Sequence, residues 1–281
     1  MSFLWALVPT IVIPSLLLYA LFFYYPHVRY LFAPPPLQPP LNENSPPKII
    51  LLVIAHPDDE CMFFAPTILG LLENGKGRME VRVLCLSTGN ASGEGKTRIK
   101  ELENSCAVLG IKREHVTVLD NPELPDDSNA WWKPVTISTA ANVHVKAIGG
   151  VDALITFDSR GVSGHFNHCA LYDGIRYYIN LPRSSTTPPP CYALKSVTLV
   201  RKYTSIFDLF ATLTPTMTHL VLAASQNEPV AMQRGIFVAS PKHIGTAWKA
   251  MRQHRSQLVW FRWLWLIFSR FMVVNEVARI R

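Results

Sequence analysis

Short apolar runs rich in β-branched residues alternate with stretches of helical periodicity through most of the chain. The first run, IILLVIA directly after Lys48, is typical of a buried strand in a parallel sheet. We predict further strands at 81–87, 115–119, 151–157, 196–200 and 219–224, and helices at 63–72, 96–109, 136–148 and 170–179. This alternation predicts an α/β sheet with right-handed crossovers, whose functional sites lie at the carboxyl ends of the strands.

The amino-terminal segment is apolar for long enough to cross a membrane. No charged side chain occurs between Ser2 and Pro26, and residues 3–23 could span a hydrocarbon core of about 30 Å as one helix. A cleaved signal peptide is the alternative, but a basic amino-terminal region is missing and the apolar stretch is too long. Because the nearest cationic side chains, Arg29 and Lys48, follow the helix, we expect residues 1–30 to be a single membrane anchor and the remainder to be cytosolic.

The rest of the chain divides into a linker, a domain and an aromatic tail. Residues 31–47 carry seven prolines, so we expect a stiff spacer that leads into a domain at 48–254. Residues 255–281 hold three of the seven tryptophans, and the seven residues between Arg262 and Arg270 are too few to span a bilayer. We expect this tail to lie in the membrane interface with its arginines reaching outward; a buried carboxyl-terminal helix is the alternative.

The composition agrees with membrane contact and disfavours nucleic acid as a partner. Of 281 residues, 49% are hydrophobic and 17% charged, with a formal net charge of +7; soluble domains usually carry roughly 25% charged residues. There is no run of five basic residues and no nucleic-acid module, so the positive charge favours an anionic membrane surface. The five cysteines include no CxxC pair, and we expect free thiols rather than a disulfide framework or a thiolate zinc site.

A cluster of acids and an imidazole follows the first strand, in the sequence Ala55-His-Pro-Asp-Asp-Glu60. Adjacent aspartates in a turn point in different directions, so His56 and Asp59 can converge on one ion and leave Asp58 free beside it as a base. The alternative is that these acids cap the following helix. Capping needs one aspartate rather than the whole motif, which favours a metal site.

A second cluster, Ser163-Gly-His-Phe-Asn-His168, follows the strand predicted at 151–157. His165 and His168 are three residues apart at a predicted helix start, so we expect them to face the same way. His168 would complete a His/Asp/His set with an open position, as in catalytic zinc sites. Two histidines at this spacing are weak evidence alone, but both clusters occur at strand ends of the same predicted sheet.

Two nucleotide-binding motifs are excluded. The loop 89–97 resembles a P-loop, but Asn90 stands where that motif requires glycine, so we expect a glycine loop that lines the site. No GxGxxG sequence follows the first strand, which excludes a dinucleotide site. His144, His219 and His243 are isolated, and we interpret them as structural or exposed.

Four ordered blocks carry a resemblance to a known family: AHPDDE, GNASGEGKTRIKELENSCAVLGI, TFDSRGVSGHFNHCAL and HRSQLVWFRWLWLIFSRFM. From about Lys48 to the carboxyl end the chain resembles the LmbE-like de-N-acetylases, and more narrowly their PIG-L branch. The resemblance implies a Rossmann-like, mostly parallel sheet with helices on both faces. It also implies zinc-dependent de-N-acetylation of the lipid-linked substrate N-acetylglucosaminyl-phosphatidylinositol, for GPI-anchor biosynthesis, at the cytosolic face of the endoplasmic reticulum membrane.

Roles carried over by position follow from this resemblance. They make His56, Asp59 and His168 the zinc ligands, Asp58 the general base and His165 the group that assists the tetrahedral intermediate. Bacterial relatives commonly have Asp where Asn167 stands, so a carboxylate that orients a histidine must come from elsewhere, with Asp158 as the candidate. The loop at 158–161 also departs from the expected DP-x-G form. Residues expected to bind substrate or support the ligands are Glu60, Arg98, Asp158, Arg160, Asn167 and His254, and Arg98, Lys100 and Arg160 are candidates for contact with the phosphate.

Alternatives remain for the metal and the substrate. A His/Asp/His face with open positions also suits Fe²⁺ or another divalent ion, so zinc is supported mainly by the resemblance. A different N-acetylglucosamine conjugate could be the substrate, and a catalytically inactive membrane scaffold of the same fold is a third possibility. The membrane helix and aromatic tail favour the lipid substrate, and the intact set of ligands, base and second histidine favours an enzyme. The sequence identifies no protein partner.

Overall fold

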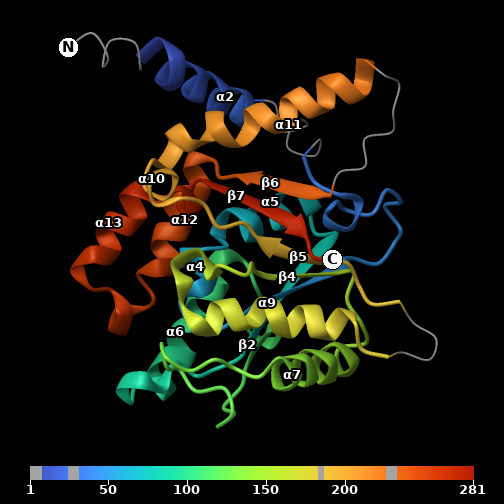
Figure 1. The fold of residues 1–281 in the computed structure, drawn as a ribbon, viewed down its shortest axis with the longest axis vertical. Coiled ribbons are helices and arrows are strands. Elements are labelled where there is room, and N and C mark those ends of the chain that lie inside the picture. Colours follow the sequence, from blue (N-terminus) through green and yellow to red (C-terminus); the bar gives the residue numbers. More distant parts are fainter. Residues whose placement is uncertain (1–7, 25–31, 183–186, 226–232) are drawn as a thin grey trace.

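The structure is a computed structural model that describes residues 8–24, 32–182, 187–225 and 233–281. These residues contain one seven-stranded sheet (Figure 1). The strand order is β3-β2-β1-β4-β5-β7-β6. Strands β1 to β5 pair in parallel, and β7 pairs antiparallel with both β5 and β6. Their bounds are β1 Lys48–Ile54, β2 Met79–Cys85, β3 Val116–Val118, β4 Ala153–Phe157, β5 Cys191–Leu194, β6 Arg234–Val238 and β7 Val274–Arg279.

Strand β1 lies in the middle of the parallel half because its apolar run is buried on both faces. Residues 50–54 are all buried, and Ile50 lies opposite Val81 of β2 and Ala153 of β4. Such a run is stable only where helices cover both faces of the sheet. The register places the carboxyl ends of β1 and β4 side by side, and the two polar clusters follow these ends.

Helices cover the two faces of the sheet in the pattern expected for alternating strands and helices. Helices α5, α6 and α12 pack together on one face, and α7 packs on α9 over the other. The helices are α2 Ile13–Tyr24, α4 Asp59–Met62, α5 Ala65–Gly75, α6 Gly95–Leu109, α7 Pro134–Ala147, α8 Gly161–Gly164, α9 Phe166–Ile179, α10 Leu199–Lys202, α11 Asp208–Ser225, α12 Pro241–Met251 and α13 Trp260–Phe268. The predicted α/β fold with a mostly parallel sheet is confirmed.

The predicted elements are confirmed in the first half of the domain and partly wrong in the second. Strands β2, β3 and β4 and helices α6, α7 and α9 fall within a few residues of prediction. The strand predicted at 196–200 is wrong, because β5 lies earlier and residues 199–202 form α10. The strand predicted at 219–224 is also wrong, because these residues belong to α11. Apolar runs this short suit a strand or a buried helix equally well.

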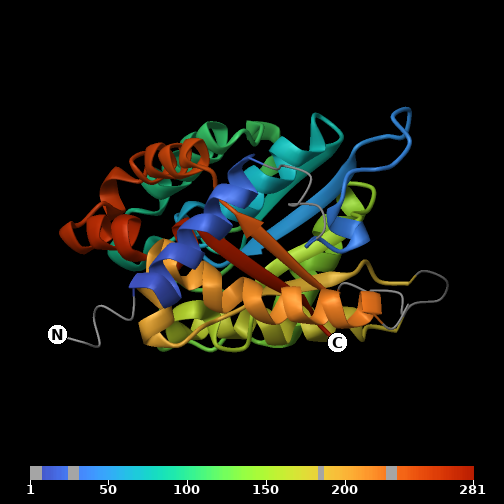
Figure 2. The same ribbon diagram turned by 90° about the horizontal axis from the view of Figure 1, so that it is seen from above.

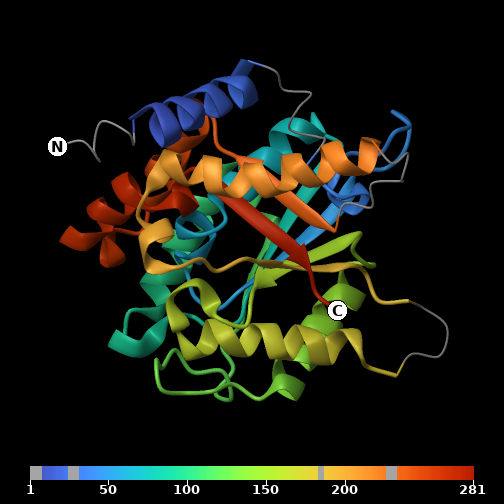
Figure 3. The ribbon, with the colours of Figure 1, turned by 45° about the horizontal axis from the view of Figure 1, so that its top comes forward.

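The amino-terminal segment packs along one edge of the sheet. A π-helical turn at Val8–Val12 leads into α2, and Figures 2 and 3 show α2 and α11 over the edge formed by β6. Ser15 is buried and its hydroxyl donates to the Phe207 carbonyl oxygen at 3.3 Å. Part of the span expected at 3–23 lies outside the described residues. Within the described parts of the chain, no helix combines the length and apolarity needed to cross a bilayer.

The proline-rich segment and the tail are both built into the domain. Phe32 and Leu37 are buried, and the Phe32 carbonyl accepts the Ile236 N–H at 2.8 Å, so the described part of the segment follows the β6 edge. The tail at 255–281 contributes α13 and then the buried strand β7. Arg270 is 0% exposed and pairs with Asp208 at 2.8 Å. The expectation that the tail arginines reach outward is therefore wrong for Arg270.

Candidate active site

A cavity of ≈ 620 Å³ opens where β1 and β4 end. The polar part of its lining comes from the motif after β1 and from the start of α9, and its apolar part comes from α13. The polar residues include His56, Asp58, Asp59, Arg98, His165 and His168, and the apolar wall includes Phe261, Leu264, Trp265 and Phe268. The two motifs that lie far apart in the sequence therefore meet in one cavity, as predicted.

The turn after β1 is fixed by the Asp59 carboxylate. Its Oδ2 accepts the backbone N–H groups of Ala55 at 3.0 Å and His56 at 2.9 Å. Asp58 adopts φ 117°, a left-handed conformation that is strained for a residue with a side chain. Asp58 stands at the N-cap of α4, but its side chain makes no capping hydrogen bond. The alternative that Asp58 caps the helix is wrong, and its carboxylate faces the cavity instead.

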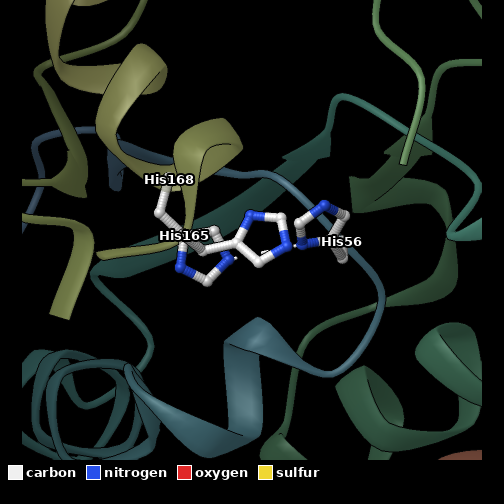
Figure 4. A group of neighbouring side chains, drawn as sticks. All are labelled: His56, His165 and His168. Atoms are coloured by element: carbon white, nitrogen blue, oxygen red, sulfur yellow. Dashed lines mark hydrogen bonds between the residues drawn. The ribbon is translucent and has the colours of Figure 1, made fainter. Parts of the chain in front are cut away.

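Three donor atoms converge beside Asp58 at the spacing that a divalent ion requires. His56 Nδ1 lies 3.3 Å from His168 Nε2 (Figure 4). His168 Nε2 also lies 3.2 Å from Asp59 Oδ1. Ligands at tetrahedral corners about 2.05 Å from zinc are about 3.3 Å apart. Both distances suit neighbouring ligands of one divalent ion, with His168 Nε2 common to the two pairs. Nitrogen atoms of His56, His165 and His168 also lie within 4.8 Å of one another, which makes His165 a further possible donor.

The remaining ring nitrogens of these ligands are held by hydrogen bonds. His56 Nε2 contacts Asn167 Oδ1 at 3.0 Å and Asp126 Oδ1 at 3.2 Å, while His168 Nδ1 contacts the Gly161 carbonyl at 3.2 Å. Such partners fix the tautomer that presents the other nitrogen to a metal.

Asp158 does not orient a histidine, contrary to expectation. Its carboxylate accepts the Ser196 N–H at 2.7 Å and the Ser196 hydroxyl at 2.5 Å. Asn167 supplies an amide oxygen to His56, and the carboxylate on His56 comes from Asp126, in the loop between β3 and α7. Sequence reasoning missed Asp126 because an acidic loop residue carries no motif.

His165 begins α9 and is poised as a neutral hydrogen-bond donor. Partial burial and the neighbouring His56 and His168 lower the pKa of His165 to about 4. Its Nδ1 accepts the Asn167 N–H at 3.3 Å, so in the neutral ring the proton belongs on Nε2. An Nε2–H donor in a cavity beside two metal ligands suits the stabilisation of a developing oxyanion.

The pKa values of two carboxylates in the same motif, Asp58 and Asp59, are shifted in opposite directions. Burial raises the pKa of Asp58 above its ordinary value, although Arg262 at 2.7 Å opposes this. Burial alone would also raise the pKa of Asp59, but His168 and His56 outweigh it and hold the pKa well below its usual range. Asp59 is therefore held ionised, as a metal ligand would need to be, whereas Asp58 has the raised proton affinity that suits a base.

Arg98 is a structural brace in the cavity wall. It donates to the carbonyl oxygens of Gly89 at 2.9 Å and Pro57 at 2.7 Å, and to Asp126 Oδ2 at 3.1 Å. A side chain at position 89 would come within 2.6 Å of the guanidinium, so glycine is needed there. The glycine loop was expected to line the site, but its Gly89 carbonyl oxygen instead holds Arg98 in place.

Glu60 and His254 form a sealed pair behind the cavity. His254 Nε2 lies 2.8 Å from Glu60 Oε1, both side chains are 0% exposed, and the Ser105 hydroxyl also donates to Glu60. Glu60 Oε2 accepts the Asp58 N–H at 3.1 Å. Both residues therefore support the turn and do not face substrate. Cys61 lies beside them and its thiol donates to the Asp58 carbonyl oxygen at 3.3 Å, while His254 Nδ1 has no hydrogen-bond partner among the described residues.

The structure does not support two of the residues predicted to contact a phosphate. Arg160 and Lys100 are exposed, and neither lines the cavity. The cation that sequence reasoning missed is Arg262, which was expected to reach outward from the tail but lines the cavity and pairs with Asp58. No local signal distinguishes an inward arginine from an outward one on an apolar helix.

The comparisons with known proteins agree with one another. The sequence profile of the PIG-L family, described as GlcNAc-PI de-N-acetylase, matches residues 51–179. The chain is 41% identical over 229 residues to the N-acetylglucosaminyl-phosphatidylinositol de-N-acetylase of Bos taurus, with 81% of each chain covered. It is 32% identical over 243 residues to the enzyme of the same name from Saccharomyces cerevisiae, covering 81% of this chain and 80% of the relative.

A relative from fission yeast and a solved structure extend these matches. The probable N-acetylglucosaminyl-phosphatidylinositol de-N-acetylase of Schizosaccharomyces pombe is 37% identical over 231 residues, covering 82% of this chain and 86% of the relative. The structure of N,N'-diacetylchitobiose deacetylase from Pyrococcus horikoshii superposes with a TM-score of 0.52 at 18% identity, covering 79% of this chain and 76% of that one. At this identity the structural match supports the fold alone.

Proposed function

The chain belongs to the PIG-L family of GlcNAc-PI de-N-acetylases, and we propose that it hydrolyses the N-acetyl group of N-acetylglucosaminyl-phosphatidylinositol, giving glucosaminyl-phosphatidylinositol and acetate in GPI-anchor biosynthesis. The observation that carries this proposal is the meeting of His56, Asp59 and His168 in one cavity, where His168 Nε2 lies 3.3 Å from His56 Nδ1 and 3.2 Å from Asp59 Oδ1, with the Asp58 carboxylate in the same lining. An inactive scaffold would have no need of this arrangement.

The residues of the cavity divide the work of amide hydrolysis. A divalent ion held by the three ligands supplies Lewis acidity, which polarises the acetamide carbonyl and makes water more acidic. Asp58 takes the proton from the attacking water, and its raised pKa suits this role. The His165 Nε2–H donates to the developing oxyanion. Asp58 then returns the proton to the departing amine nitrogen.

We propose zinc as the ion, on the strength of the family resemblance. One carboxylate and two imidazoles with an open position are a donor set that catalytic zinc sites use, and they also accommodate Fe²⁺. Metal analysis of protein purified without oxygen decides between the two. A stoichiometric amount of iron with no zinc would contradict the assignment of zinc but leave the proposed reaction intact.

We also propose that the protein works at the cytosolic face of the endoplasmic reticulum membrane, held by its amino-terminal segment and by α13. Apolar side chains are exposed on α13 and on α10 next to it, where Tyr203 contacts Trp265 with ring centroids 6.0 Å apart. Trp260 is 75% exposed, and Phe261 and Leu264, which line the cavity, are exposed as well. An aromatic surface at the cavity mouth suits a substrate that stays in a bilayer.

Vesicle binding tests this surface. We expect Trp260→Ser combined with Val200→Ser to lower partitioning onto phosphatidylcholine and phosphatidylinositol vesicles by at least about tenfold, because two exposed apolar side chains are lost. Val143→Ser, on the exposed side of α7, is the matched control and should bind like the wild type. Equal binding of all three proteins would contradict the proposed surface.

Acetate release tests the reaction itself. The full chain is incubated with N-acetylglucosaminyl-phosphatidylinositol in neutral detergent, with and without a chelator. We expect acetate in stoichiometric amounts with glucosaminyl-phosphatidylinositol, loss of activity with the chelator, and recovery on addition of Zn²⁺. Acetate release from a water-soluble N-acetylglucosamine conjugate, but not from the lipid, would favour the alternative substrate.

A further inference from the structure

Arg262 connects the apolar helix α13, which lines the cavity, to the Asp58 carboxylate. It lies on α13, and its side chain is 19% exposed in the cavity lining. Its Nη2 donates to Asp58 Oδ2 at 2.7 Å. The carboxylate proposed as the base is therefore paired with a cation from the helix that forms the cavity mouth.

The two arginines in the described lining differ in how fully they are used. Both terminal nitrogens of Arg98 donate to buried oxygens, as set out above. In both arginines Nε has no acceptor among the described residues, but Nη1 of Arg262 faces only the Met62 sulfur, a weak acceptor. Arg262 therefore has a terminal nitrogen left for another anion, whereas both terminal nitrogens of Arg98 are used.

We propose that Arg262 binds the phosphodiester of the substrate and, in doing so, gives up its ion pair with Asp58. This inference rests on the proposed function, because it assigns the substrate its anionic group. It makes Arg262 a specificity-determining residue that also controls when the base is free.

The order of groups along the cavity matches the order of groups in such a substrate. Exposure rises along the lining: the imidazoles of His56 and His168 and the carboxylates of Asp58 and Asp59 are buried, the Arg262 side chain is 19% exposed, and the apolar side chains of α13 are exposed, namely Phe261, Leu264 and Phe268. A lipid-linked glucosaminide has an acetamide at one end, a phosphodiester after the inositol, and acyl chains beyond. Each group then meets side chains of its own chemistry.

The exchange of partners has a physical basis. A guanidinium binds phosphate oxygens in a two-pronged geometry, and its spare donors are not satisfied by Asp58 alone. The ion pair holds the guanidinium against Asp58 Oδ2, where it competes with water for that oxygen. Arrival of the phosphodiester therefore frees the base only when a substrate of the correct class is bound.

The experiment compares two substrates that differ in charge. One is N-acetylglucosaminyl-phosphatidylinositol; the other has an uncharged alkyl ether in place of the phosphodiester and keeps the sugar, inositol and acyl chain. Acetate release in neutral detergent gives kcat/KM for each. We expect the wild type to prefer the phosphodiester, and Arg262→Gln to reduce that preference by about 10- to 100-fold, the range for loss of a charge-assisted hydrogen bond.

Two further variants separate this role from general effects of charge. Arg262→Lys keeps the charge without the two-pronged geometry and should keep part of the preference. Arg252→Gln removes the same charge from an exposed residue outside the cavity, 6.0 Å above the Trp263 ring, and should keep all of it. If Arg262→Gln does not fold, as judged by its thermal midpoint, the preference of Arg262→Lys decides.

The outcomes distinguish this inference from the proposed function. An equal loss on both substrates in Arg262→Gln would overturn the inference and leave Arg262 a structural partner of Asp58. A wild type that cleaves both substrates equally would also overturn it while the proposed reaction stands. A wild type that releases no acetate from the phosphodiester substrate would contradict the proposed function itself.

Discussion

Asp59 and Glu60 are neighbours in the sequence, and each is paired with a histidine from a distant part of the chain, yet they lie in different surroundings. Asp59 meets His168 at 3.2 Å in the lining of the cavity. Glu60 meets His254 at 2.8 Å behind it, where both side chains are 0% exposed. The chemistry of the two pairs is the same, but the Asp59–His168 pair lines the cavity and the Glu60–His254 pair does not. We therefore propose the first pair for metal binding and the second as support for the turn.

We expect the largest effect from substitution of Asp58, the proposed base. This substitution should lower turnover without lowering metal binding. We predict that Asp58→Asn lowers kcat by about 10³- to 10⁴-fold while the metal content is retained, because Asp58 accepts a proton and is not a ligand. His56→Ala should lose both activity and metal. Acetate release and metal analysis of the same samples provide the measurement. Equal loss of metal in the two variants would contradict this division of roles.

Breaking the sealed pair should instead lower stability. We predict that His254→Ala reduces the free energy of unfolding in urea by about 3–5 kcal/mol, because Glu60 is left as a buried charge without its partner. Metal content per folded molecule should stay the same. The control is His144→Ala, at a half-buried histidine in α7, with an expected loss below about 1 kcal/mol. A loss of metal without a loss of stability would place His254 at the metal centre.

His165 tests whether the cavity holds an oxyanion donor as well as a base. We predict that His165→Ala lowers kcat by about 10²- to 10³-fold with little change in KM, since the hydrogen bond forms mainly in the transition state. His165→Gln keeps a donor and should recover part of the rate. A parallel loss of metal in His165→Ala would show that His165 is a ligand, which the spacing of its ring to His56 and His168 also permits.

The smallest effect concerns how stability changes with pH. Burial alone would raise the pKa of Glu60 and lower that of His254, but their mutual attraction outweighs it and shifts both in the opposite directions. The contribution of Glu60 is present above its ordinary pKa of 4.5 and is lost as pH falls through the lower folded value. The contribution of His254 is present below 6.5 and is lost as pH rises through the higher folded value.

The pair therefore stabilises the fold most between about pH 4.5 and 6.5. The measurement is the difference in thermal midpoint between the wild type and a Glu60→Gln, His254→Gln double variant from pH 4 to 9, with a chelator present to remove metal effects. We expect the difference to be largest inside this window and to decrease on both sides. A difference that does not vary with pH would show that the pair is not ionised.

The parallel half of the fold was predictable because its signals are local. The apolar run of β1 predicts a central buried strand, and β2, β3 and β4 follow the same logic. The antiparallel strands β6 and β7 were missed, because β7 comes from a tail whose aromatic residues favour a membrane interface. Long-range pairing with β5 and β6 makes this segment a strand, and no short window of sequence reports such pairing.

In the candidate site, too, some features could be predicted from the sequence and others depend on long-range packing. The residue types and their order in the chain determined the α/β half and brought His56, Asp58, Asp59 and His168 to one site, because strand ends and turns follow from local pattern. Tertiary structure alone decided that Asp126 rather than Asp158 contacts a histidine, that Glu60 is sealed by His254, and that Arg262 points inward. The direction of a side chain on an amphipathic helix depends on what that helix packs against, and this is a property of the whole fold.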